Sequence, residues 1–222
     1  MGLTLVIGNK NYSSWSLRPW LFLKHNRIPF SEVRIPLYQE GSTAEQQIYS
    51  PSGLVPVLLD GDLRVWDSLA ICEYASEKFL NGRGLPADMA ARAVARSISA
   101  EMHSGFQQLR ANLPMNLKAR YRWQPVSEAA EKDIQRVIGL WTQCRSKYGS
   151  DGPWLFGSFS IADAMFAPVA IRFRTYDVPL DGIARQYVDN LYGLEEMQAW
   201  HADALKESEV LPQLEKQGLQ PA

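Results

Sequence analysis

The fold is decided by residues 53–74, which read GLVPVLLDGDLRVWDSLAICEY. Two short apolar runs flank the dipeptide Asp60-Gly61, and Asp-Gly between such runs is a strong signal for a β-hairpin. Pro56 stands where the first strand begins, a place where its missing N–H costs no ladder hydrogen bond. After the hairpin, Asp67 and Ser68 precede apolar residues at helical spacing. The stretch therefore predicts a strand, a turn, a strand and a helix.

The residues before this stretch predict four more elements. Residues 3–7 form a short apolar run typical of a buried strand. Ser13 and Ser14 precede an apolar helical pattern, and serine is a favoured residue at a helix N-terminus. Residues 30–37 alternate apolar and charged side chains as a half-buried strand does, and residues 43–49 fit a short helix. The resulting order is that of a thioredoxin-like domain: a βαβ unit, a second helix, a hairpin and a covering helix.

The second part of the chain shows only helical patterns. Residues 81–87 contain two glycines and a proline and are the clearest break. Ser160 and Asp163 have the spacing of a capping box, in which each side chain bonds the other residue's backbone N–H. We expect an α/β thioredoxin-like domain at residues 1–80, a linker at 81–87 and an all-helical domain at 88–222. Its helices are expected at about residues 90–113, 127–148, 160–171, 186–192 and 195–208.

Composition excludes several classes of function. The 222 residues carry a formal charge of −1, which offers no electrostatic basis for binding nucleic acid or an anionic membrane. No apolar run is long enough for a membrane span, and the N-terminus lacks the pattern of a signal peptide. Cys72 and Cys144 both fall in helical patterns, so we expect buried free thiols, a reducing compartment and a cytoplasmic location.

Two separated motifs carry a resemblance to the glutathione transferase family. Val55-Pro56 followed by Asp67-Ser68 resembles the glutathione-binding half of that family, and Ser160–Asp163 matches the capping box of its central helix. The resemblance implies a cis Val55–Pro56 bond and a Val55 backbone that binds the cysteinyl part of glutathione. It also implies that Asp67 and Ser68 hold the γ-glutamyl group, that glutathione is the co-substrate, and that the protein is a homodimer.

The stretch Ser13-Ser-Trp-Ser-Leu-Arg18 resembles the zeta-class signature Ser-Ser-Cys-Ser-X-Arg, in which the first serine is catalytic. Glutathione chemistry needs a thiolate, and a hydroxyl at a helix N-terminus can stabilise that anion. The resemblance thus makes Ser13 the first catalytic candidate and Ser14 the second, with Trp15 as a glutathione contact. Trp15 replaces the zeta cysteine, so the class is open. Capping without chemistry is the alternative role for both serines.

The helical part is expected to shape a pocket for the second substrate, a small electrophile. An arginine can clamp a substrate carboxylate, and the zeta class uses one near the end of the helix that follows the capping box. The aligned position here is about Thr175, with Arg174 adjacent, and solvated or ion-paired arginines are at least as good an alternative. The Tyr12 hydroxyl is a rival catalyst, since other classes of the family use a tyrosine. Those classes place it at the end of the first strand, nearer Gly8, so the position of Tyr12 argues against this role. The candidates for this pocket are Tyr12, His103, Met115, Arg172 and Arg174.

We therefore predict an enzyme: a glutathione transferase in which a serine hydroxyl activates the glutathione thiolate for attack on a small electrophile. Two alternatives are open, the glutathione-dependent cis–trans isomerisation of maleylacetoacetate and a non-catalytic module that binds glutathione or another ligand. Thioredoxin-like disulfide exchange is disfavoured because no cysteine stands at the first helix start. No nucleotide or metal is expected, since there is no glycine-rich phosphate loop and the three histidines are scattered.

Overall fold

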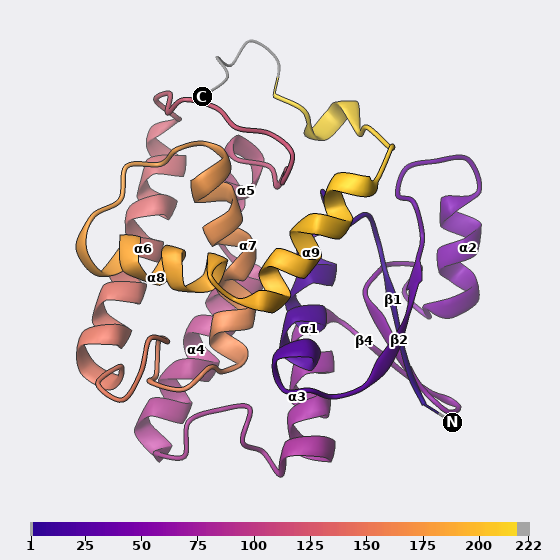
Figure 1. Cartoon of the computed structure of the whole chain (residues 1–222), viewed down its shortest axis with the longest axis horizontal. Coiled ribbons are helices and arrows are strands. Elements are labelled where there is room, and N and C mark those ends of the chain that lie inside the picture. Colours follow the sequence, from indigo (N-terminus) through magenta and orange to yellow (C-terminus); the bar gives the residue numbers. More distant parts are fainter. Residues whose placement is uncertain (1, 217–222) are drawn as a thin grey trace.

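The computed structural model describes residues 2–216 and contains a four-stranded sheet followed by a group of helices (Figure 1). The first part comprises β1 (Leu3–Ile7), α1 (Ser14–His25), β2 (Phe30–Arg34), α2 (Ser42–Tyr49), β3 (Val57–Asp60), β4 (Leu63–Trp66) and α3 (Ser68–Leu80). The second comprises α4 (Met89–Ser104), α5 (Gln107–Asn112), α6 (Glu128–Tyr148), α7 (Ile161–Thr175), α8 (Gly182–Tyr192), α9 (Glu195–Lys206) and a 3-10 turn at Pro212–Leu214. The predicted fold class is confirmed.

The sheet has the strand order β2-β1-β3-β4. β1 runs parallel to β2, and the β3–β4 hairpin adds to the other side of β1 in antiparallel fashion. The hairpin is closed by Gly61 and Asp62, with Asp60 and Leu63 as the last pair. Gly61 has a φ of +61°, a left-handed conformation that glycine adopts without strain. The predicted hairpin is therefore confirmed, and its turn chemistry explains its position.

One expected helix is wrong: residues 90–113 form two helices instead of one. α4 ends at Gly105, where an added Cβ would lie 2.8 Å from the carbonyl oxygen of Glu101. Phe106 then takes a left-handed φ of +58° with its ring buried. The Arg110 side chain turns back and donates hydrogen bonds to the carbonyls of Met102 and Gly105, which the end of α4 leaves free. The second strand is also shorter than expected, because Pro36 has no N–H to donate.

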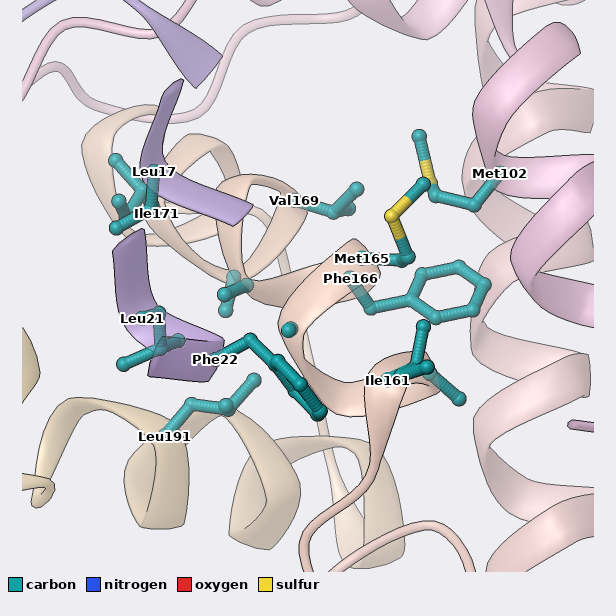
Figure 2. Packing of buried hydrophobic residues seen from close by; sticks show 14 of the residues in the cluster. Leu17, Leu21, Phe22, Met102, Ile161, Met165, Phe166, Val169, Ile171 and Leu191 are labelled. Carbon is teal, nitrogen blue, oxygen red and sulfur yellow. The ribbon is translucent and has the colours of Figure 1, made fainter. Parts of the chain in front are cut away.

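Helix α7 is the centre of the core. Every residue from Ile161 to Phe173 is buried, and the helix packs against both α1 and α4. Leu17, Leu21 and Phe22 of α1 face this helix and α8 (Figure 2). The capping box is present, and the Asp163 carboxylate also accepts hydrogen bonds from the Leu155 N–H and the Tyr187 hydroxyl. One hydrophobic cluster thus joins α1 and α3 to the helical part. That residues 81–87 separate two domains stays a prediction.

No helix within the described residues is both long and apolar enough to cross a membrane.

Candidate active site

The strand register brings three of the sequence motifs to one edge of the sheet. Val57 pairs with Val6 on one side and with Trp66 on the other. The residues that follow β1, precede β3 and follow β4 therefore gather at this edge. They are the loop leading to Ser13, the Val55–Pro56 pair and the Asp67–Ser68 pair. Both α1 and α3 begin here, so the positive ends of two helices meet at the same edge.

The start of α1 is held by a chain of hydroxyl groups. Ser13 is the N-cap residue, and its Oγ accepts a hydrogen bond from the Ser16 N–H at 3.4 Å. The Ser13 hydroxyl donates to Ser16 Oγ at 2.8 Å, and the Gly8 N–H donates to the same oxygen at 3.1 Å. Ser16 is fully buried and so joins the end of β1 to the first turn of α1. Since hydroxyl hydrogens rotate, Ser16 can instead donate to Ser13 and leave the Ser13 proton for a ligand.

Ser14 differs from Ser13 in the state of its hydroxyl. Its backbone N–H donates to the Tyr12 carbonyl at 3.0 Å. Its hydroxyl makes no hydrogen bond to another residue within residues 2–216. The Ser14 hydroxyl is thus free to donate without breaking a protein contact, whereas the Ser13 hydroxyl must first turn away from Ser16.

The glutathione-binding candidates lie on the same edge. The Val55–Pro56 peptide bond is cis, as the resemblance implies. Asp67 is the N-cap of α3, and its Oδ1 accepts a hydrogen bond from the Leu69 N–H at 2.8 Å. Its other oxygen lies 3.3 Å from His103 Nε2. The Ser68 hydroxyl is buried and has no partner within the described chain, so it can still accept a donor from a ligand or donate to one.

Trp15 gathers three charged or titratable side chains around its ring. The guanidinium of Arg18 lies 4.2 Å from the ring centroid and that of Arg110 lies 4.8 Å from it. The His103 ring meets the indole edge-on at 5.2 Å. The structure therefore brings Trp15, His103 and Asp67 together and adds Arg18 and Arg110 to the same group of side chains.

The remaining pocket candidates make contacts within the protein. Burial, with the neighbouring Glu215, raises the pKa of Tyr12 to about 12, and its hydroxyl donates to that carboxylate. Met115 is buried in the core. Arg172 is buried too; it donates to the Leu113 carbonyl, and burial lowers its pKa to about 9. Arg174 lies 4.3 Å from the Tyr192 ring. A substrate role for these four residues stays a prediction.

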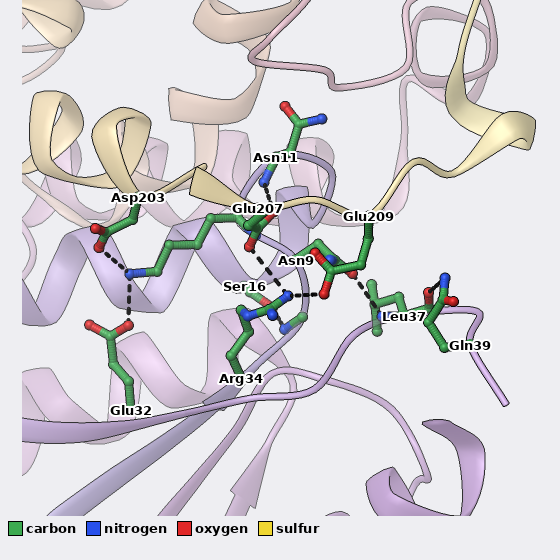
Figure 3. A network of polar contacts seen from close by, with 12 residues as sticks. Asn9, Asn11, Ser16, Glu32, Arg34, Leu37, Gln39, Asp203, Glu207 and Glu209 are labelled. Carbon is green, nitrogen blue, oxygen red and sulfur yellow. Dashed lines mark hydrogen bonds and ion pairs between the residues drawn. The ribbon is translucent and has the colours of Figure 1, made fainter. Parts of the chain in front are cut away.

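The segment after α9 holds the loop that leads to Ser13, which no local sequence pattern indicates. The Glu207 carboxylate accepts hydrogen bonds from the backbone N–H groups of Lys10 and Asn11 at 2.7 and 3.0 Å (Figure 3). Arg34 pairs with Glu209 at 2.9 Å, and the Trp200 indole N–H donates to the Lys10 carbonyl at 2.9 Å. The end of the helical part thus fixes the backbone just before α1.

Neither cysteine is poised for chemistry. Cys72 and Cys144 are buried free thiols, and burial raises the pKa of each, that of Cys144 to about 11. Within residues 2–216, no group of three or more His, Cys, Asp or Glu side chains has the geometry of a metal site.

Comparison with known proteins identifies relatives that match both the sheet-containing part and the helical part of the chain. Residues 12–78 match the model of the glutathione S-transferase N-terminal domain, and residues 124–202 match that of the C-terminal domain. The chain is 28% identical over 189 residues to glutathione S-transferase Z2 of Arabidopsis thaliana, covering 80% of this chain and 84% of that protein. It is 38% identical over 99 residues to maleylacetoacetate isomerase of Mus musculus, covering 43% of this chain and only 45% of that protein.

A solved structure shows the same fold. A glutathione transferase homologue from Burkholderia, crystallised with bound glutathione, superposes with a TM-score of 0.71 at 23% identity. The superposition covers 93% of this chain and all of that one.

Proposed function

The chain belongs to the glutathione S-transferase family, and we propose that it activates glutathione as a thiolate at the start of α1. The observation that supports this most is the convergence of two helix N-termini on the sheet edge that carries the cis Val55–Pro56 bond. Such an edge suits a ligand with several anionic groups.

The γ-glutamyl and cysteinyl parts of glutathione each have a complementary group in the proposed site. The Val55 backbone pairs with the cysteinyl peptide. The buried, unpartnered Ser68 hydroxyl and the α3 N-terminus receive the γ-glutamyl carboxylate, and the Asp67 carboxylate receives the α-ammonium. Ser13 or Ser14 then donates a hydrogen bond to the sulfur.

The size of the effect follows from general energetics. A free cysteinyl thiol has a pKa near ~8.5, so only about 3% is ionised near neutral pH. A hydrogen bond to a charged acceptor contributes roughly 1.5–3 kcal/mol, which lowers the thiol pKa by about 1–2 units. The ionised fraction of the bound thiol would then rise to between about a quarter and three-quarters at pH 7, and the thiolate would attack a small electrophile without a separate base.

The test is the rate of glutathione conjugation to a chloronitrobenzene in the Ser13→Ala and Ser14→Ala variants. The serine that contacts sulfur should lower kcat/KM about tenfold or more. Ser97→Ala on the exposed face of α4 is the matched control and should leave the rate unchanged. If both active-site variants keep full activity, the serine mechanism is wrong. If glutathione binds but neither the unaltered protein nor any variant catalyses conjugation, a non-catalytic binding role is favoured.

Isomerisation of maleylacetoacetate is the second candidate. The similarity to the mouse isomerase and the Ser-Ser-Trp-Ser-Leu-Arg motif favour it, whereas Trp15 in the cysteine position is a departure from the zeta signature. Glutathione-dependent conversion of maleylacetoacetate, followed by its ultraviolet absorbance, would support this activity, and no conversion at millimolar glutathione would exclude it.

We also propose a homodimer and a cytoplasmic location. Trp66 of β4, Phe79 of α3 and Met89 of α4 are large apolar side chains left exposed on the single chain, and each is a candidate for contact with a second copy. Light scattering should give twice the mass of one chain, and the single-chain mass would contradict this part of the proposal.

A further inference from the structure

Arg18 is the least explained buried charge in the structure. Its side chain is 0% exposed, and none of its three guanidinium nitrogens has a hydrogen-bond partner among the described residues. Its guanidinium lies over the face of the Trp15 ring, 4.2 Å from the ring centroid. An arginine buried without an acceptor is costly, because its charge is removed from water and nothing replaces the lost hydrogen bonds.

The neighbouring groups do not neutralise Arg18. From α5, Arg110 brings a second positive charge, but its own donors are used by the carbonyls that end α4. From α7, Arg172 brings a third positive charge, and its guanidinium donates hydrogen bonds to the carbonyls of Leu113 and Arg110.

Few groups near Arg18 could offset this positive charge. The Cys72 thiol of α3 is neutral. The nearby Asp67 carboxylate already accepts from the Leu69 N–H and lies against His103 of α4. Burial lowers the pKa of Arg18, and the positive charges of Arg110 and Arg172 lower it further. Asp67 and Cys72 act in the opposite direction. A guanidinium stays protonated in proteins, so the cluster keeps an excess of positive charge.

The position of Arg18 links this charge to the start of α1. Helical side chains lean toward the N-terminus of their helix, and residues three apart lie on the same face. The Arg18 guanidinium accordingly lies over Trp15, within the turn that begins at Ser13. Its positive potential adds to that of the helix N-terminus, and a charge acts over several ångströms in a protein interior without contact.

We propose that Arg18 is a buried cation whose charge, located at the face of the Trp15 ring, holds the glutathione sulfur at Ser13 or Ser14 in its ionised form. This inference rests on the proposed function. Arg18 does not touch the sulfur; it acts through the electrostatic potential at the α1 N-terminus. The bound thiolate supplies the negative charge that the ligand-free cluster lacks, so the ligand-free protein bears the cost of an unpaired buried cation.

The proposal predicts two effects of opposite kind for Arg18→Met, which keeps apolar bulk and removes the charge. The pKa of the bound glutathione thiol, read from its ultraviolet thiolate band, should rise by about one unit, a tenfold change in ionisation. The melting temperature of the ligand-free protein should stay equal or rise, because an uncompensated buried charge is gone. Arg18→Gln should shift the thiol pKa in the same direction, whereas Arg18→Lys should retain most of the depression.

Arg96→Met is the matched control. Arg96 lies on the exposed face of α4, and its Nε is 3.8 Å from a carboxylate oxygen of Glu73. It should change neither the thiol pKa nor the melting temperature. A thiol pKa in Arg18→Met and Arg18→Gln equal to that of the unaltered protein would overturn the inference. An unaltered protein whose bound thiol titrates like free glutathione would instead overturn the proposed function itself.

Discussion

Replacing Asp163 with asparagine should destabilise the protein by several kcal/mol. Asp163 is fully buried, and its two oxygens accept four hydrogen bonds. Oδ1 receives the Leu155 N–H and the Tyr187 hydroxyl at 3.0 Å each. Oδ2 receives the N–H and the hydroxyl of Ser160 at 2.9 Å each.

The magnitude follows from this geometry. In either orientation, the asparagine NH2 replaces an oxygen that accepts from one backbone N–H and one hydroxyl. The hydroxyl can turn and accept from the NH2, but the buried N–H loses its acceptor at a cost of about 1–3 kcal/mol. The two remaining bonds go to a neutral oxygen and are each weaker by about 1 kcal/mol, which predicts a loss of roughly 2–5 kcal/mol in the free energy of unfolding. Urea denaturation of Asp163→Asn measures this loss, and Asp189→Asn on the exposed face of α8 is the control, with an expected change within about 0.5 kcal/mol.

The pH dependence supplies a second check. Burial raises the pKa of Asp163 to about 6, against hydrogen bonds from Leu155, Ser160 and Tyr187 that lower it. A folded-state pKa above the unfolded value means that this contribution to stability is complete below about pH 4 and is lost as the pH rises through about 6. The stability difference between the unaltered protein and Asp163→Asn should therefore shrink, by up to about 3 kcal/mol, between acidic and mildly alkaline pH. A loss under about 1 kcal/mol throughout would refute the reasoning.

Three further changes test the contacts around the site. Ser16→Ala removes the acceptor that holds Ser13 and should lower kcat/KM several-fold in steady-state assays, with a stability loss of about 1–3 kcal/mol. His103→Phe keeps an aromatic edge but loses the 3.3 Å contact to Asp67, so it should raise the KM for glutathione several-fold with kcat within about twofold. Glu207→Gln weakens two charge-assisted bonds to the loop before α1 and should cost about 1–3 kcal/mol by thermal denaturation.

Each of these has an outcome that contradicts it. Unchanged kinetics in Ser16→Ala would show that the hydroxyl chain at α1 has no role in activity. For His103→Phe, an equal loss of affinity for glutathione and for its analogue without the α-amino group would remove the link to Asp67. A Glu207→Gln protein with the same melting temperature as the unaltered protein would show that the segment after α9 does not hold the loop.

Local chemistry made much of the fold predictable. The Asp60-Gly61 turn and the Ser160–Asp163 capping box are written in residues a few positions apart, and both are present in the structure. The break between α4 and α5 was missed because it depends on Arg110, whose side chain reaches back to the carbonyls of the preceding helix. Helical spacing alone cannot indicate such a contact.

The candidate site shows the same division. Ser13 could be recognised as a helix start because capping is a local property. The surroundings of Arg18 could not, since they come from α3, α5 and α7. Glu207 reaches its partners, Lys10 and Asn11, from nearly 200 residues away in the chain, and no pattern around it marks that role.

Whether the start of α1 stabilises a glutathione thiolate through a serine hydroxyl is best tested by an ultraviolet pH titration of bound glutathione. The titration compares the unaltered protein with Ser13→Ala and Ser14→Ala. We expect a thiol pKa about 1–2 units below that of the free thiol, returning upward in one of the two variants. A bound thiol that titrates like free glutathione in all three proteins would contradict it.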